Sequence, residues 1–410
     1  MKVIVSHPTG NANVRAAVNG MYDAGILEAF YTAIASFPGT FLDELAAKGP
    51  LSEIRRRRVD EHLKSFTNLH PLREIGRLIA SRAGLTGFTA HESGMLSIDA
   101  VYKSLDRNVA ANLRKYTNAS AVYAYEDAAG YSFKQAKTIG LECLYDLPIG
   151  YWRAGRKLLE NEATRWPEWA ATLTTFKDSE IKLARKDEEL KLADRIFVAS
   201  SFTAKTLNYY PGVIAPVKVI PYGFPAVGAV KEYDNAAGRP LKLLFVGGLS
   251  QRKGIADLFS AVNKLGRHVQ LTIAGSKTGN DCPALNTELA KHTWIPSLPH
   301  AAILQLMKEH DVLLFPSLFE GFGLVITEAM AQGTPVITTE RTAGPDIIEN
   351  DNNGWLIKAG QEHELQMAIE KLLQQPQLIA RAGRAAMETA RLRPWPVYGK
   401  ELAEAIIYKN

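Results

Sequence analysis

Strand patterns alternate with helix patterns in the second half of the chain, and this alternation most restricts the possible fold. Short apolar runs rich in β-branched residues lie at 242–248, 269–276, 311–317, 334–339 and 354–357. Helical patterns lie between them at 254–265, 283–292, 299–309 and 324–332. Such an order predicts a parallel sheet that is covered by helices on both faces.

The first half repeats this alternation less regularly. Strand patterns lie at 2–6, 120–127, 194–200 and 216–223, and a charged helical pattern lies at 177–193. A chain of 410 residues exceeds the usual size of one core. We therefore expect an α/β protein with two doubly wound domains, whose ligands bind in the cleft outside the carboxyl ends of the strands.

The domain boundary is expected where periodicity disappears. Residues 224–240 are rich in Gly, Ala and Pro and show neither a helix nor a strand period, which predicts a linker. The domains are then residues 1–223 and 241–391.

Composition excludes several classes of protein. With 46% hydrophobic and 22% charged residues the chain is typical of globular proteins. Its two cysteines, Cys143 and Cys282, are far apart, which argues against a disulfide framework or a structural zinc site and fits a reducing cytoplasm. Pro8 and Gly10 interrupt any secretory signal. No apolar run approaches the ~18–20 residues that span a bilayer.

The stretch LFEGFGLVITEAMAQGTPVIT contains two carboxylates, Glu320 and Glu328, with glycines at 321 and 323. Glycines let the backbone approach a ligand, and a helix that begins at Leu324 presents free amide N–H groups to an anion. Glu328 can accept hydrogen bonds from vicinal hydroxyls. Either acid alone fits a surface or capping role. Their combination with the glycines and a preceding buried strand indicates a ligand site.

A second strand–turn–helix unit is VGGLSQRKGIADLFSAV. Gly247 and Gly248 form the turn, and Arg252 and Lys253 precede the helix. Two cations beside a helix amino terminus suit a diphosphate. Alone, the pair would more often be a solvated surface feature, and neither dinucleotide-binding nor P-loop glycine spacing is present.

These stretches resemble a known family. GLSQRKG, FPSLFEGFGLVITEAMAQGTPVI and AGPDIIENDNNGWLI are similar to the C-terminal domain of the family 4 glycosyltransferases, retaining enzymes of the GT-B fold. ADRIFVASSFTAKTL and VIPYG resemble the segment before that family's linker. RLRPWPVYGKEL resembles its final helices, which implies that residues 392–410 cross back to the N-terminal domain. The likeness covers roughly residues 190–410.

The resemblance implies transfer of a sugar from a UDP- or GDP-linked donor to a glycan or lipid-linked acceptor, in surface polysaccharide or glycolipid assembly. Arg252 and Lys253 would hold the diphosphate, Glu328 the ribose and Glu320 the donor sugar. The amides of 321–324 would assist. Residues 274–276 and 295–297 would flank the base, and Gly247 and Gly248 would let phosphate approach the backbone. The donor-binding residues are therefore Glu328, Gly247, Gly248, Gly275, Ser276, Ile295, Gly321, Phe322, Gly323 and Leu324.

The two cations would stabilise the departing diphosphate preferentially in the transition state. No Asp-x-Asp occurs in the sequence, so we expect no essential divalent metal and no other required cofactor. One departure from the family is that Gly247-Gly248 stands where Gly-Arg is frequent, and Arg252 is the candidate to replace that cation.

The N-terminal domain departs further from the family. Gly10, Asn11 and Asn13 occupy the loop after the first strand, where acceptor or donor contacts are expected. The family's cleft histidine does not align here, so Asp127 as a catalytic residue and Asp146 as a cleft residue are the candidates. Tyr151 is a candidate for sugar stacking. His7 is interpreted as structural.

Residues 51–82 combine Arg55–Arg58, Arg73, Arg77 and Arg82 with apolar residues at helical spacing, namely Val59, Leu63 and Phe66. This pattern fits either a basic surface that rests on anionic lipid or a solvated face of core helices. We expect a cytoplasmic protein, peripheral on the inner face of the membrane under the first interpretation. Nucleic acid is not expected as a partner, because the basic residues are not interleaved with aromatics.

Alternatives to transferase activity are a nucleotide-sugar epimerase or phosphorylase of the same fold, or a non-catalytic protein that binds sugar nucleotides. Release of nucleoside diphosphate that depends on an acceptor would distinguish these possibilities.

Overall fold

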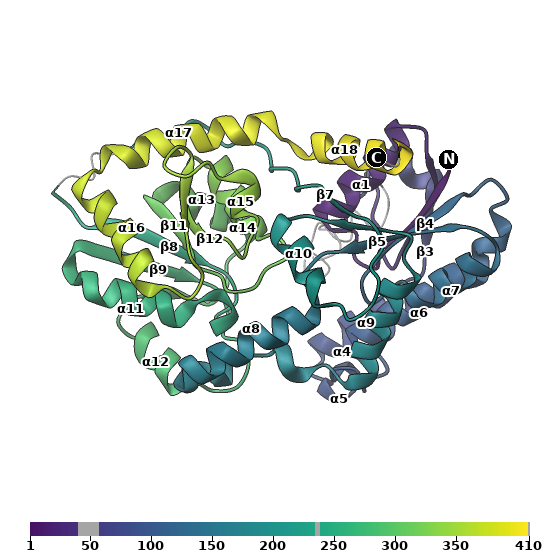
Figure 1. Ribbon diagram of the computed structural model, residues 1–410, viewed down its shortest axis with the longest axis horizontal. Helices are drawn as coiled ribbons and strands as arrows, with labels where there is room; N and C mark the ends of the chain where they lie inside the picture. The colour runs from purple at the N-terminus through teal and green to yellow at the C-terminus, as the bar shows by residue number, and fades with distance from the viewer. Residues whose placement is uncertain (40–56, 234–237, 409–410) are drawn as a thin grey trace.

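Two parallel sheets, one in each half of the chain, form the framework of the computed structural model, which describes residues 1–39, 57–233 and 238–408 (Figure 1). The first sheet has the strand order β3-β2-β1-β4-β5-β6-β7 and the second β10-β9-β8-β11-β12-β13. The strands of the first sheet are β1 (Val3–Ser6), β2 (Leu27–Thr32), β3 (Thr67–Leu69), β4 (Ala121–Tyr125), β5 (Glu142–Leu147), β6 (Arg195–Val198) and β7 (Val217–Val219). Those of the second are β8 (Leu241–Val246), β9 (Val269–Ala274), β10 (Thr293–Ile295), β11 (Val312–Phe315), β12 (Val336–Thr339) and β13 (Gly354–Ile357).

Helices connect the strands and lie on both faces of each sheet (Figure 1). The longer helices of the first half are α1 (Ala12–Asp23), α4 (Leu72–Arg82), α6 (Ile98–Asn112), α7 (Gly130–Thr138), α8 (Trp152–Arg165) and α9 (Glu180–Leu192). Two shorter ones are α5 (Thr86–Thr89) and α10 (Ser201–Thr206). The second half contains α11 (Ile255–Leu265), α12 (Pro283–Leu289), α13 (His300–Glu309), α14 (Leu324–Ala331), α15 (Gly344–Ile347), α16 (Glu362–Gln374), α17 (Gln377–Leu392) and α18 (Trp395–Tyr408).

The expected fold class, two doubly wound parallel domains, is confirmed. The apolar runs of the second half become β8, β9, β11, β12 and β13. Strands β2, β3, β5 and β10 were not anticipated. β5 reads ECLYDL and carries acids at both ends of its apolar stretch, whereas β3 and β10 are only three residues long. The expected linker lies between β7 and β8, and its residues 234–237 lie outside the described part of the chain.

Helix α18 packs along α1 of the first half, so the end of the chain crosses from the second half to the first (Figure 1). The two helices approach so closely that a Cβ atom on Gly20 would lie 2.1 Å from the carbonyl oxygen of Gly399. A second connection is α8, whose Arg165 pairs with Asp257 of α11 at 2.5 Å.

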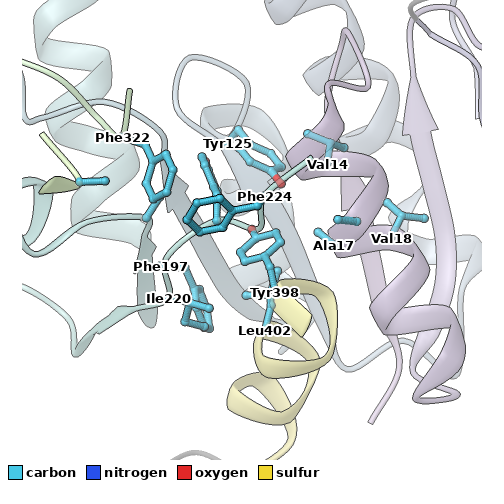
Figure 2. Packing of buried hydrophobic residues seen from close by; sticks show 14 of the residues in the cluster. Val14, Ala17, Val18, Tyr125, Phe197, Ile220, Phe224, Phe322, Tyr398 and Leu402 are labelled. Atoms are coloured by element: carbon cyan, nitrogen blue, oxygen red, sulfur yellow. The ribbon is translucent and has the colours of Figure 1, made fainter. Parts of the chain in front are cut away.

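The apolar core is continuous between the two halves. Tyr222 packs its ring against Phe322 with 4.9 Å between centroids, and against Tyr398 of α18 with 5.1 Å. Figure 2 shows Phe224 among these rings, beside Tyr125. The domains are therefore joined by buried apolar contact as well as by the linker.

The basic segment 51–82 was predicted to be either a lipid-facing surface or a solvated face of core helices, and its described part begins at residue 57. Val59 and Leu63 are buried in the core, so this apolar face does not form an outer surface. Arg57 and Arg77 both contact the buried carboxylate of Glu74, with Arg77 Nε 2.7 Å away. Arg55 and Arg56 lie outside the described residues. Over the described ranges no helix combines the length and apolarity needed to cross a bilayer.

The contact between α1 and α18 gives a test of this packing. Gly20→Ala places a methyl group against rigid backbone, and we expect it to lower the free energy of unfolding by roughly 1–3 kcal/mol. Gly87→Ala is the matched control, because Gly87 is also helical but has no atom within 4 Å of an added Cβ. Urea unfolding midpoints measure both variants, and equal midpoints would contradict the close approach.

Candidate functional site

A cleft of about 460 Å³ lies between the loops that follow β1 and β5 on one side and β8 and β11 on the other. Its walls come from both halves of the chain. The residues that line it in the N-terminal half are His7, Asn11, Asn13, Tyr102, Pro148, Ile149 and Tyr222. Those of the C-terminal half are Val246, Gly247, Arg252, Lys253, Phe315, Glu320, Gly321, Phe322, Gly323, Leu324, Val325 and Glu328.

Glu320, which is buried, and Arg252 and Lys253, which are partly buried, form an ion cluster in this cleft. Arg252 Nη1 lies 2.8 Å from Glu320 Oε1, and Lys253 Nζ contacts the same oxygen. Ser317 Oγ donates to it at 2.9 Å. The sequence predicted these three charges at one site but did not predict that the acid would hold both cations.

The charges of this cluster oppose the effect of burial on the acid. Burial by itself would raise the pKa of Glu320, but the adjacent Lys253 and Arg252 outweigh it and the pKa is lowered. Burial lowers the pKa of Lys253, and Glu320 partly offsets that effect. With Glu320 ionised and both cations charged, the cluster carries one net positive charge, which suits an anionic ligand.

The need for a glycine at position 321 comes from packing between the two halves of the chain, whereas we expected it to come from the approach of a ligand. A Cβ atom there would lie 1.8 Å from the carbonyl oxygen of Pro148, so the backbone of the N-terminal half fills the space that we assigned to a ligand. The carbonyl of Gly321 also accepts from Ser200 Oγ at 2.5 Å and Thr203 Oγ1 at 3.0 Å. The loop before α14 is thus held by the opposite domain.

Helix α14 begins at Leu324 as predicted, and its N-cap is Gly323 with a φ of 90°. Gly323 occupies the left-handed region that favours glycine. Glu328, one turn into the helix, lines the cleft and accepts from His300 Nε2 at 2.9 Å. His300 was not identified from the sequence, because nothing in its local pattern links it to a residue 28 positions later.

The residues assigned to the base lie around Gly247. The Gly247 amide donates to Ala274, and the Gly275 amide donates to Ile295 at 2.9 Å. An added Cβ at Gly275 would lie 1.9 Å from the carbonyl oxygen of Gly247. Gly247 lines the cleft, whereas Gly248, Gly275, Ser276 and Ile295 do not.

In the N-terminal wall, Asn11 and Asn13 line the cleft, and Asn13 Nδ2 donates to Tyr222 Oη at 3.2 Å. Gly10 does not line it, and its amide donates to Nδ1 of His7. Tyr102 of α6 lines the cleft and was missed, because α6 has an ordinary amphipathic pattern with no signal for a site.

Besides Gly10, three candidates of the N-terminal half lie outside the residues that line the cleft. Asp127 pairs with Arg185 at 2.9 Å. Asp146 is buried and accepts from the hydroxyl of Tyr123. Tyr151 is fully buried and donates to Asp187 at 2.6 Å. Polar residues after a strand can be held by internal partners as easily as by a ligand, and their spacing does not distinguish the two.

A larger hollow of about 920 Å³ lies between α1, α18 and residues 58–62. None of the predicted site residues line it, so we assign the candidate site to the smaller cleft, where the ion cluster lies.

Known proteins with similar sequences include glycosyltransferases. Residues 231–389 match the family model described as Glycosyl transferases group 1. The chain is 28% identical over 265 residues to a glycogen synthase of Mycobacterium tuberculosis, over 61% of this chain and 60% of that protein. It is 26% identical over 337 residues to a D-inositol 3-phosphate glycosyltransferase of Thermobifida fusca, over 70% of this chain and 75% of that protein.

Solved structures are similar over nearly the whole chain. A sucrose-phosphate synthase from Thermosynechococcus elongatus has a TM-score of 0.65 at 16% identity, over 99% of this chain and 98% of that one. Anabaena HepE in complex with UDP-glucose has a TM-score of 0.60 at 17% identity, over 99% of both chains. The protein therefore has the GT-B fold, and residues 231–389 match a glycosyltransferase family model.

Asp146 gives a prediction on stability. Burial raises the pKa of Asp146 from near 3.8 to about 7. The folded protein therefore keeps this proton to a higher pH than the unfolded chain. The contribution of Asp146 to the free energy of unfolding is therefore complete below about pH 4 and is lost as the pH rises to 7.

We expect Asp146→Asn to remove this decrease of stability with rising pH, because asparagine does not titrate. The unfolding free energy of the variant, minus that of the wild type, should rise by a few kcal/mol between pH 4.5 and 8, at about 1.4 kcal/mol per pKa unit. Asp23→Asn, an exposed acid at the end of α1, is the control. A difference that does not change with pH would contradict the assignment.

Proposed function

We propose that the protein is a glycosyltransferase that moves a sugar from a UDP- or GDP-linked donor to a glycan or lipid-linked acceptor, with retention of configuration. The observation that carries the proposal is the ion cluster at the start of α14, where Arg252 and Lys253 share Glu320 inside the interdomain cleft. The match to a glycosyltransferase family model over residues 231–389 supports the reaction class.

In this proposal the cations receive the diphosphate. Their charges lie in a partly buried site, so they act on the diphosphate more strongly than they would in water. The charge on the leaving group grows as the glycosidic bond breaks, so cations that are already held in place stabilise the transition state more than the ground state. Glu320 keeps them in place before the donor binds.

The rest of the donor is assigned to neighbouring groups. Glu328 is exposed enough to accept from ribose hydroxyls. Gly247 and Gly248 would let phosphate approach the backbone, and Gly275, Ser276 and Ile295 would flank the base. Residues 241–391 are proposed as the donor domain. Residues 1–223, together with 392–410, form the acceptor domain, with Asn11 and Asn13 on its wall and 224–240 as linker.

We propose no essential divalent metal, because two protein cations already face the site of the diphosphate. The test is release of nucleoside diphosphate from UDP- and GDP-sugars, with and without acceptor and with EDTA. Acceptor-dependent release that survives EDTA supports the proposal. Interconversion of the donor sugar, or tight binding without turnover, would favour the epimerase or the non-catalytic binder.

Lys253→Ala tests the diphosphate assignment. Loss of one preorganised charge should lower kcat/KM by roughly 10²–10³-fold, as for removal of a single donor to a developing anion. Lys264→Ala, which removes an exposed lysine at the other end of α11, is the control and should keep wild-type activity. A near-normal kcat/KM for Lys253→Ala would exclude this residue from the diphosphate site.

We propose further that an exposed apolar surface of the N-terminal half serves a lipid-linked acceptor. Large apolar side chains are exposed on α4, on α5 and in the segments that flank it, and at the start of α6. We call this set, which consists of Leu72, Ile75, Ile79, Leu85, Phe88, Met95 and Ile98, the apolar surface. Exposed apolar patches of this kind mark contact with another protein or with a membrane.

Charge favours an anionic bilayer as the occupant of the apolar surface. Arg73 lies within it and donates to the carbonyl of Met95 at 2.6 Å, and Arg82 is exposed at the end of α4. The acids of this stretch are engaged, since Glu74 is buried between arginines and Glu92 accepts from Ser179. Tyr102, one turn after Ile98, lines the cleft, so we propose that this surface rests on anionic lipid beside the site.

Leu72→Ser/Ile79→Ser should weaken binding to phosphatidylglycerol vesicles at low salt by at least about tenfold, because each large apolar side chain contributes roughly 1.5–3 kcal/mol when fully buried. Sedimentation of the protein with vesicles measures it. Ile181→Ser is the matched control, since Ile181 is 81% exposed on α9, outside the apolar surface. A wild type that does not sediment, or a double variant that sediments equally, would contradict membrane contact.

A further inference from the structure

His7 follows β1 and its ring lines the interdomain cleft. The sequence analysis interpreted His7 as structural. One ring nitrogen, Nδ1, does have a structural role. The backbone amides of Thr9 and Gly10 both donate to Nδ1 at 3.1 Å. The opposite nitrogen, Nε2, has no hydrogen-bond partner among the described residues.

Two amide donors determine which nitrogen carries the proton. A nitrogen that accepts from N–H groups must offer its lone pair, so Nδ1 is unprotonated. The neutral ring then carries its hydrogen on Nε2. The loop that follows β1 thus holds His7 as a hydrogen-bond donor whose free N–H belongs to the edge without a partner.

The surroundings keep this ring neutral. The ring is buried, and it packs edge-on against Tyr125 with 4.6 Å between centroids. Burial, together with the positive charge of Arg57, lowers the pKa of His7 to about 3. A ring that stays neutral cannot exchange protons with substrate near neutral pH, which separates it from a general base.

Its position indicates what it would contact. The cations on the opposite wall face the diphosphate in the proposed function, on which this inference rests. The part of the ligand that reaches the N-terminal wall is then the sugar. An uncharged donor suits a hydroxyl oxygen, which is an uncharged acceptor.

We propose that His7 is a specificity-determining residue that donates a hydrogen bond from Nε2–H to a hydroxyl oxygen of a sugar in the cleft. The sugar is either the one transferred or the one that accepts it. His7 acts by positioning, and it neither takes nor gives a proton.

The experiment compares His7→Phe and His7→Gln with the wild type. Phe keeps the ring and removes both nitrogens, whereas Gln keeps an N–H donor at similar reach. We expect kcat/KM to fall about tenfold in His7→Phe, the effect of one hydrogen bond, and to be partly restored in His7→Gln. His70→Phe, at a histidine that bonds Ser104 away from the cleft, should stay near wild type.

Binding measurements locate the hydroxyl. Calorimetry with UDP and UDP-glucose, and with GDP and GDP-mannose, compares each nucleotide with its sugar-linked form. If the hydroxyl belongs to the donor sugar, His7→Phe weakens the sugar-linked form and leaves the bare nucleotide unchanged. If it belongs to the acceptor, both bind normally and only the KM for the acceptor rises.

Two further readouts separate positioning from proton transfer. Nitrogen NMR of the imidazole should show the Nε2–H tautomer with no titration between pH 5 and 8. The pH profile of kcat/KM should keep its shape in His7→Gln. The inference would be overturned by NMR that shows a proton on Nδ1 or a titration near pH 6.5. It would also be overturned by loss of one limb of the pH profile in His7→Gln, or by a normal kcat/KM in His7→Phe. Each of these outcomes would leave the proposed function standing. An inactive wild type would overturn the proposed function, and the inference with it.

Discussion

One carboxylate that holds two cations is the interaction on which the candidate site depends. Arg252 and Lys253 both contact Oε1 of Glu320, and the acid is only 7% exposed. A buried charge without a partner is costly, and breaking a buried pair by removing one member typically costs about 3–5 kcal/mol. Glu320 therefore makes it possible to keep two cations in a cleft before any ligand is present, while leaving one net positive charge for an anion.

The cleft also depends on the contact between the two halves of the chain. Gly321 packs against the carbonyl of Pro148, and its own carbonyl accepts from Ser200 and Thr203. The loop that carries Glu320 is thus fixed by the N-terminal half, although its acid binds cations of the C-terminal half. Any change in how the halves pack would move the ion cluster with respect to His7 and Asn13. The geometry of the site therefore depends on how the two domains pack.

Elements in which apolar or charged residues recur in short patterns were predictable from the sequence. Apolar runs predicted β8, β9, β11, β12 and β13, and acid–glycine spacing placed Glu320 and Glu328 at one cleft. The candidate site residues of the N-terminal half were less predictable. Asp146 follows the pattern of a site residue, yet its partner Tyr123 lies on the neighbouring strand, and such a pairing depends on sheet order that no local pattern reveals.

His7 is the converse case, because its local sequence suggested a structural residue and the structure places it in the cleft lining. A lone histidine beside a proline gives no sign of function, and its meaning comes from two amides that point at one nitrogen and leave the other free. The two walls of the cleft then differ in kind. The C-terminal wall presents charge, which binds phosphates strongly but does not distinguish one sugar from another. The N-terminal wall presents neutral donors from His7, Asn11 and Asn13, whose geometry can discriminate among hydroxyls. Under the proposed function, the C-terminal wall would supply affinity for the anion, and selection of the sugar would fall to the N-terminal wall, whose lining residues are uncharged.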